Sequence, residues 1–282
     1  MPFLNYQMAS MEINKMSEIL LEVNNLSINF YIPKKGSIFT FKKDVVTAVN
    51  NVSFQINKGE VFGIVGESGS GKSTIARAII GLNKITSGSV QFNQQELTNL
   101  TTKSLRLARK DMRMIFQDPL ASLSPRMTLG NIIAEPLKIY QPELTKLEIK
   151  QKVEDMLEKV GLSKNMVNRY PHEFSGGQCQ RIGIARALIV KPKLLICDEP
   201  TTALDMCIQA QIIELLKKMN REFNMAILLI THDLRVVAGM CEHVLVLQHG
   251  QKVEYNDTLS LFCHPKQQYT KQLLTAIPRL PS

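Results

Sequence analysis

Two segments near the amino terminus have the period-two alternation of β-strands. Residues 19–31 alternate weakly between apolar and polar side chains, and residues 45–56 resume this character beyond a Pro- and Gly-containing loop at 33–39. Residues 61–65 are a continuous apolar run instead, which is typical of a strand buried on both faces of a parallel sheet. A helix is predicted directly afterwards, at residues 73–82, where apolar side chains fall on one face.

Helical periodicity dominates the middle of the chain. It extends from residue 128 to residue 169, and we expect Pro136 and Pro142 to break this stretch into pieces. Strands separated by helices predict a parallel α/β sheet, into which the helical stretch is inserted. The other predicted elements are strands at 89–92, 112–116, 194–197, 226–230 and 244–248, and helices at 98–110 and 208–220.

Composition indicates the cellular compartment of the protein but says little about its chemistry. The chain has 282 residues, 44% of them hydrophobic, but no apolar run approaches the roughly 18–20 residues that span a bilayer. The first residues lack the pattern of a secretory signal, so we expect any membrane role to be peripheral. Five cysteines without CxxC spacing fit neither a disulfide framework nor a zinc site and favour a reducing cytoplasm. Residues 1–18 show no clear periodicity and are expected to be a disordered N-terminal extension.

The formal net charge of +9 permits several interpretations. A basic protein can bind nucleic acid, or it can be attracted to an anionic membrane leaflet. Lysine and arginine are distributed along the whole chain, however, so we favour an evenly spread basic surface over a dedicated patch.

A glycine-rich segment follows the apolar run at 61–65 and precedes the helix at 73–82. It matches the phosphate-binding loop GxxxxGK[ST] and has the strand before it and the helix after it that this loop requires. Glycines let backbone N–H groups wrap phosphates, Lys72 supplies positive charge to them, and the Ser73 hydroxyl can ligate Mg²⁺. The residues expected to bind ATP here are Gly66, Glu67, Ser68, Gly69, Ser70, Gly71, Lys72, Ser73 and Thr74.

Two adjacent carboxylates, Asp198 and Glu199, end the predicted strand at 194–197. The carboxyl ends of strands are where open α/β sheets bind ligands. We expect Asp198 to reach Mg²⁺, directly or through water, and Glu199 to orient and polarise an attacking water. Helix capping is a competing role for such acids on their own, but the upstream phosphate loop makes it the weaker interpretation.

A third segment, Phe174, Ser175, Gly176, Gly177 and Gln178, precedes another helical run. A serine and two glycines before a helix form a second anion-binding N-terminus, which one chain does not need for one nucleotide.

Taken in order, these segments resemble the nucleotide-binding subunits of ABC transporters. The segment 174–178 is similar to the family's signature, with phenylalanine where leucine is more usual. Gln117 resembles the Q-loop glutamine, His232 the switch histidine, and residues 202–205, ending in Asp205, the D-loop. The resemblance implies catalytic roles for Glu199, His232 and Gln117, and Mg²⁺ contacts for Ser73, Gln117 and Asp198. It also implies that an aromatic residue stacks on adenine, for which Phe30 and Tyr31 both qualify and Phe30 is preferred.

The same resemblance implies an architecture. The expected fold is α/β: a P-loop NTPase (RecA-like) core with an antiparallel β subdomain and an inserted α-helical subdomain. The nucleotide-binding domain is expected at residues 19–257, with the helical subdomain at about 95–190 and a C-terminal tail at 258–282. Two subunits would face each other head to tail, so that the signature of one completes the ATP site of the other.

Several segments are similar to the ATPases of oligopeptide and dipeptide importers, in particular to the second, F-type ATPase of these systems. They are residues 115–119, 122–128, 169–173, 208–211, 264–265 and 276–278. The implied partners are a second ABC ATPase subunit, two transmembrane permease subunits and, indirectly, an extracellular solute-binding protein, with the chain at the cytoplasmic face of the cell membrane. Nickel importers share much of this pattern and remain an alternative.

A different class, ABC-type ATPases that act on nucleic acid or ribosomes, is disfavoured. Those relatives usually carry two cassettes or a long coiled coil, whereas this sequence has one phosphate loop, one signature and no sustained heptads. A cassette that only binds nucleotide is disfavoured too, because both Glu199 and His232 are present.

Overall fold

The computed structural model describes residues 18–33, 43–118, 120–202 and 204–276. The expected disorder of residues 1–18 therefore lies outside the described residues, except at Glu18. The same is true of most of the loop at 33–39, of positions 119 and 203, and of the last part of the tail.

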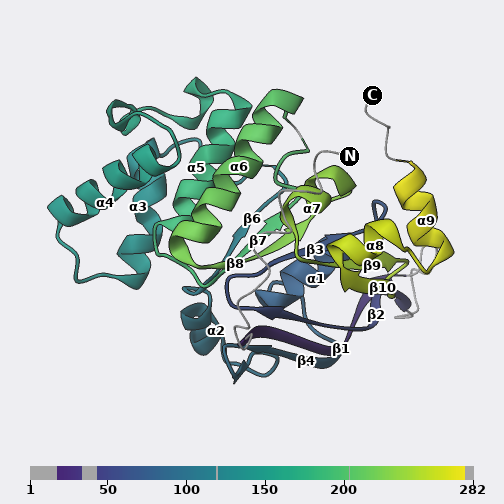
Figure 1. Cartoon of the computed structure of the whole chain (residues 1–282). Coiled ribbons are helices and arrows are strands. Elements are labelled where there is room, and N and C mark those ends of the chain that lie inside the picture. Colours follow the sequence, from purple (N-terminus) through teal and green to yellow (C-terminus); the bar gives the residue numbers. More distant parts are fainter. Residues whose placement is uncertain (1–17, 34–42, 119, 203, 277–282) are drawn as a thin grey trace.

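A six-stranded sheet forms the centre of the molecule (Figure 1). The strand order is β10-β9-β3-β8-β7-β6, in which β10 is antiparallel to β9 and the other pairs are parallel. The strands are β3 (Val61–Val65), β6 (Met112–Ile115), β7 (Leu194–Asp198), β8 (Ala226–Ile230), β9 (His243–Gln248) and β10 (Gln251–Asp257). Every residue of β3, β7 and β8 is buried, because both faces of the sheet are covered, as the continuous apolar runs predict.

A four-stranded antiparallel sheet of order β2-β1-β4-β5 covers one face of the six-stranded sheet. The two sheets share an apolar cluster of buried side chains. Its strands are β1 (Ile19–Pro33), β2 (Lys43–Asn57), β4 (Ser87–Phe92) and β5 (Gln95–Glu96). Helix α1 (Lys72–Ile79) contributes Ile75 and Ile79 to the same cluster, and the Phe54 and Phe62 rings of the two sheets stack with centroids 5.2 Å apart. The predicted antiparallel β subdomain is thus present and packs on the parallel sheet.

Helices cover the opposite face and extend to one side, where α3 and α4 lie (Figure 1). They are α3 (Leu129–Tyr140), α4 (Lys146–Lys159), α5 (Gly176–Leu188), α6 (Met206–Phe223) and α7 (Leu234–Met240), with short 3₁₀ helices η2 (Lys164–Met166) and η3 (Pro171–Glu173). A shorter helix, α2 (Thr102–Ala108), follows β5. The range 95–190 is not entirely helical, because β5 pairs with β4 and β6 pairs with β7.

The expectation that Pro136 interrupts the helical stretch is wrong. Pro136 lies inside α3 and is buried there, whereas Pro142 follows the end of that helix. A proline in a helix interior removes one backbone hydrogen bond and disfavours the helix. Here the helix continues through it, because neighbouring side chains such as Ile133 and Leu137 are fully buried in the main apolar cluster.

The C-terminal tail folds into two helices that sequence patterning did not predict. These are α8 (Thr258–Cys263) and α9 (Gln268–Thr275), and they follow β10. Leu261 of α8 and Tyr269 of α9 belong to the main apolar cluster. The described part of the tail is therefore an integral part of the domain's packing.

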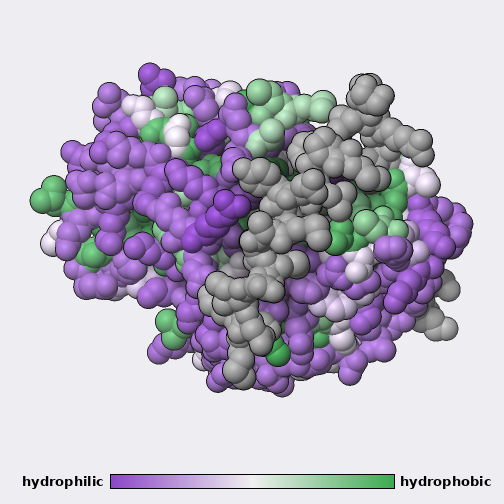
Figure 2. Space-filling view, in the orientation of Figure 1, coloured by the Kyte–Doolittle hydropathy of each residue, from purple (hydrophilic) through white to green (hydrophobic). Residues whose placement is uncertain are grey.

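Hydrophilic residues dominate the face shown in Figure 2, and apolar residues appear there in separate areas. Within the described ranges, no helix combines the length and the hydropathy that crossing a bilayer requires.

A buried carboxylate at the amino-terminal edge of the sheet gives a pH-dependent contribution to stability. The Glu60 carboxylate, on a residue 4% exposed, lies 2.7 Å from His243 Nδ1, and this contact is the main reason that the pKa of His243 is raised. Glu242 and Asp257 also raise this pKa, burial lowers it, and the Tyr255 ring stacks beside the imidazole.

We therefore expect the stabilising contribution of His243 to be fully present below its unfolded-state pKa of about 6.5 and to be lost as pH rises through the higher folded-state pKa. At about pH 6 the His243→Gln variant should be less stable to urea than the wild type, by less than about 1 kcal/mol, because the imidazole is 37% exposed and solvent weakens its pairing with Glu60. The difference in the free energy of unfolding should shrink by about pH 9. A difference that is constant across this range would contradict the assignment.

Candidate active site

The phosphate loop connects the carboxyl end of β3 to the start of α1, as its sequence context predicts. Gly66 has φ +150°, and a Cβ placed there would lie 2.1 Å from the Leu247 carbonyl oxygen. Gly71 has φ +104°, and its Cβ would lie 2.5 Å from the Ala48 carbonyl oxygen. Only glycine fits these two positions, where the loop backbone comes close to its neighbours.

Lys72 bridges this loop from the first turn of α1. It is 4% exposed, and its Nζ donates hydrogen bonds to the backbone oxygens of Gly66 (2.8 Å) and Glu67 (2.7 Å). Burial lowers the pKa of Lys72, while Glu199 and Asp198 act in the opposite direction. The side chain thus places a cation at the floor of the loop, held by neutral carbonyls that a phosphate can displace.

Asp198 ends β7 directly opposite the first turn of α1. The Ser73 Oγ donates a 2.7 Å hydrogen bond to Asp198 Oδ1. Burial raises the pKa of Asp198, which is 1% exposed, and the hydrogen bond from Ser73 partly offsets this effect. A buried carboxylate beside a hydroxyl fits a hard cation such as Mg²⁺, which prefers oxygen ligands and keeps several waters. In the described residues, no group of three or more His, Cys, Asp or Glu side chains offers a complete metal cage.

Glu199 follows Asp198 in a left-handed backbone conformation (φ +48°), which is uncommon for residues other than glycine. Its N–H donates to the Ile230 carbonyl of β8 at 2.8 Å, and this bond anchors the strained residue. Its Oε2 accepts hydrogen bonds from Thr202 Oγ1 (2.9 Å) and Gln117 Nε2 (3.4 Å) and lies 3.4 Å from His232 Nδ1. Side chains from three separate loops therefore converge on one carboxylate oxygen.

A cleft of about 580 Å³ opens over these groups. It is lined by Ala48, Glu67, Ser68, Gly69, Gly71, Lys72, Ser73, Thr74, Gln117, Glu199 and His232. The structure thus places most of the phosphate loop in one hollow with the three expected catalytic residues. The other two loop residues, Gly66 and Ser70, are buried. Asp198 is buried too and accepts the hydrogen bond from Ser73.

The expected signature residues do not line this cleft. Ser175 is the N-cap of α5 and forms a capping box with Gln178, and Phe174 packs against the main apolar cluster. A Cβ on Gly177 would lie 2.5 Å from Ile208 of α6, and Asp205 caps that helix through the N–H groups of Cys207 and Ile208. The signature and the D-loop residue therefore start two neighbouring helices outside the cleft.

The two aromatic candidates for the adenine contact also lie outside the cleft. Phe30 and Tyr31 are on β1, opposite Val46 and Val45 of β2, and are 40% and 59% exposed. Because adjacent strand residues point to opposite faces, one of the two rings at most can contact a given base.

Three residues support the site in ways that no local sequence pattern predicts. Ala48 of β2 lines the cleft, Thr202 holds Glu199, and the Tyr269 hydroxyl accepts a 3.2 Å hydrogen bond from the N–H of Glu67. Thr202 was recognised only as part of the D-loop segment, and nothing in the local sequence around Ala48 or Tyr269 marks their proximity to the loop.

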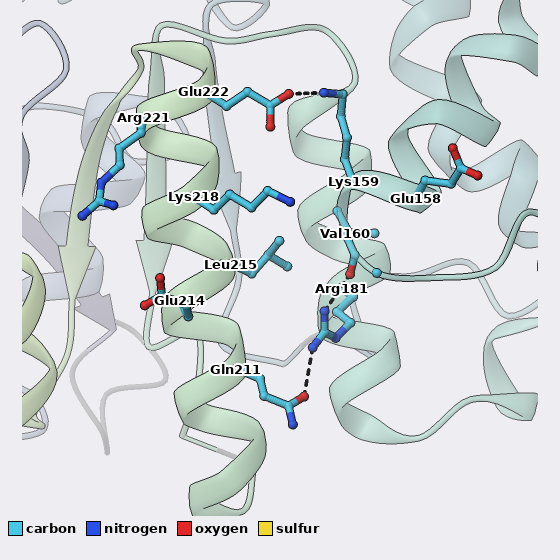
Figure 3. A pocket seen from close by; sticks show the side chains of 11 residues that line it. Glu158, Lys159, Val160, Arg181, Gln211, Glu214, Leu215, Lys218, Arg221 and Glu222 are labelled. Atoms are coloured by element: carbon cyan, nitrogen blue, oxygen red, sulfur yellow. Dashed lines mark hydrogen bonds and ion pairs between the residues drawn. The ribbon is translucent and has the colours of Figure 1, made fainter.

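A larger hollow of about 810 Å³ lies between α6, the end of α4 and the middle of α5, where Arg181 lines it (Figure 3). Among its charged side chains, Lys159 pairs with Glu222, and Arg181 donates to the Val160 carbonyl and to Gln211. None of the expected catalytic residues lines it. The smaller cleft, at the carboxyl ends of the strands, is therefore the candidate active site.

Comparison with known proteins agrees with this geometry. Residues 49–202 match the sequence profile of the ABC transporter family. The chain is 51% identical over 268 residues to the oligopeptide transport ATP-binding protein OppF of Haemophilus influenzae, covering 95% of this chain and 81% of that protein. It is 49% identical over 261 residues to OppF of Escherichia coli, with coverages of 93% and 78%.

Among solved structures, it resembles the dimeric ATP-binding cassette MJ0796 in a post-hydrolysis state bound to ADP and Pi, with a TM-score of 0.75 and 30% identity over 85% of this chain and 99% of that one. The protein belongs to the ABC transporter family. Its fold is that of the family's ATPase, with the antiparallel β subdomain. The family and the fold expected from the sequence are therefore both confirmed.

Proposed function

We propose that this chain binds and hydrolyses ATP as a motor subunit of an importer for oligopeptides. One observation carries the catalytic part: Glu199 is held by Thr202, Gln117 and the nearby His232 at the mouth of a phosphate loop. A carboxylate fixed in this way beside a phosphate cradle can orient a water for in-line attack and accept its proton.

In this proposal, different residues of the cleft bind the phosphates, bind Mg²⁺ and orient the attacking water. Lys72 exchanges its carbonyl partners for the β- and γ-phosphates of ATP, and the loop N–H groups bind the remaining phosphate oxygens. Ser73, Asp198 and Gln117 would hold Mg²⁺, which supplies charge neutralisation on the phosphates when bound. Glu199 orients the water, and Gln117 and His232 keep that carboxylate in place.

The position of the signature supports a second subunit in the complete site. Phe174–Gln178 lie at a helix N-terminus outside the cleft, where they can contact the ATP of a facing subunit but not that of their own. The similarity to a dimeric cassette supports the same arrangement. Either Phe30 or Tyr31 stacks on adenine, and we favour Phe30.

We infer the cargo and the partners from the similarity to OppF proteins, which covers more than nine-tenths of this chain. In this proposal, the chain pairs with a second ABC ATPase on the cytoplasmic face of the cell membrane. Two permease subunits form the path, and an extracellular binding protein delivers the peptide. Nickel is the main competing cargo.

The test is purification of the tagged full-length chain from detergent-solubilised membranes, followed by mass spectrometry of the proteins that accompany it. Two permeases, a second ATPase and a peptide-type binding protein are the expected set. Recovery with a nickel-type binding protein would reject the cargo. Recovery with ribosomal or DNA-associated proteins and no permease would reject the transport function altogether.

A further inference from the structure

The C-terminal tail reaches the phosphate loop through one side chain. Tyr269 of α9 is 8% exposed, and its hydroxyl accepts a 3.2 Å hydrogen bond from the N–H of Glu67. The two residues are 202 positions apart in the chain. Glu67 is the second residue of the loop, so the tail supports the loop near its beginning.

Helix α9 is held firmly enough to act as such a support. The buried carboxylate of Glu254, on β10, accepts hydrogen bonds from the N–H groups of Lys266 (2.9 Å) and Gln267 (3.1 Å), just before α9 begins. The Tyr269 ring packs into the main apolar cluster together with Leu261 of α8. Both anchors connect the tail to the edge of the central sheet rather than to solvent.

The hydrogen bond from Glu67 belongs to a peptide unit that is clamped on both sides. The peptide between Gly66 and Glu67 donates its N–H to Tyr269 and offers its carbonyl, that of Gly66, to Lys72 Nζ at 2.8 Å. Because a peptide is planar, fixing the direction of the N–H also fixes the direction of the carbonyl. Gly66, at φ +150°, lacks the side chain that would otherwise restrict rotation of this unit.

We propose that Tyr269 is a positioning residue for ATP binding: its hydroxyl holds the Gly66–Glu67 peptide, and with it the phosphate loop, in the orientation that accepts nucleotide. The inference rests on the proposed ATP site and gives the tail a role in it. Without the hydroxyl, the loop populates further orientations, and ATP binds only the competent fraction. The apparent affinity then falls, whereas turnover of bound ATP does not change.

The test uses the full-length chain in its purified complex and the Tyr269→Phe variant, which removes one hydroxyl and keeps the buried ring. We expect KM for ATP and the dissociation constant in an ATP titration to rise about two- to tenfold, with kcat unchanged and the thermal midpoint lowered by at most a few degrees. Tyr255→Phe is the matched control, because Tyr255 of β10 is 43% exposed and stacks on Phe62 away from the loop. It should leave KM unchanged.

A second variant, Glu254→Gln, weakens the anchor of α9 without touching the loop and should raise KM in the same direction. An unchanged KM in Tyr269→Phe would overturn the inference, as would a lowered thermal midpoint with no change in KM, which indicates packing alone. Lys72→Ala in the same titration separates the two claims. If Lys72→Ala also binds ATP normally, the proposed ATP site itself is wrong.

Discussion

Replacing Glu199 with glutamine should lower kcat for ATP hydrolysis by about a thousandfold while leaving the affinity for ATP almost unchanged. Glutamine keeps the shape of the side chain, so the hydrogen bond from Thr202 and the contact with His232 can persist. It lacks the negative charge that polarises the attacking water and the basic oxygen that accepts its proton. Because Glu199 contributes to the water and not to the phosphates, binding should be preserved.

The measurement is steady-state ATP hydrolysis together with an ATP titration of the same preparation. Glu214→Gln is a suitable control, because the Glu214 side chain on α6 is 73% exposed and does not line the cleft. It should hydrolyse ATP as the wild type does. Near-normal hydrolysis by Glu199→Gln would reject Glu199 as the base, and a loss of binding would place Glu199 in the nucleotide cradle instead.

Replacing Lys72 with alanine should weaken ATP binding by roughly ten- to a hundredfold. The substitution removes the buried ammonium that donates to the Gly66 and Glu67 carbonyls and that would donate to the phosphates. Among the described residues, no other lysine lines the cleft that could replace the lost charge. The same substitution at the exposed Lys84 is the control for the loss of one positive charge.

The ATP titration that measures this effect should be made with both variants at the same ionic strength, because exposed charges contribute in a salt-dependent way. Equal dissociation constants for Lys72→Ala and the wild type would contradict the phosphate-loop assignment. Equal weakening by Lys84→Ala would show that overall charge, and not the position of Lys72, determines affinity.

The arrangement of residues in the cleft was largely predictable from the sequence, because each part is encoded by a short local pattern. The loop at 66–73 lies between a buried strand and a helix, and Asp198 and Glu199 end another strand. Parallel strands place such ends at one edge of a sheet, so these groups were expected to meet. Glu199 lines the cleft with the loop, and Asp198 accepts a hydrogen bond from Ser73. Gln117 and His232 were expected from the family resemblance, and the structure places both beside Glu199.

Other features depend on long-range contacts that local patterns do not encode. Helix α3 continues through Pro136 because its buried face packs in the main apolar cluster, an effect that outweighs the local preference of proline. The contact between Tyr269 and Glu67 joins residues 202 positions apart, and no periodicity signals it. Strand β10 and the tail helices α8 and α9 were missed, because they are short and their position is set by Leu261 and Glu254 in the folded protein.

Accumulation of a peptide by the reconstituted importer is the decisive test of ATP-driven peptide import by this protein. Proteoliposomes that contain the complex purified with this chain, with ATP on the side of the ATPases and the binding protein on the other, would be supplied with a radiolabelled tripeptide. We expect ATP-dependent accumulation with the wild type and none with Glu199→Gln. Equal accumulation with both proteins, or accumulation of nickel but not of peptide, would contradict this expectation.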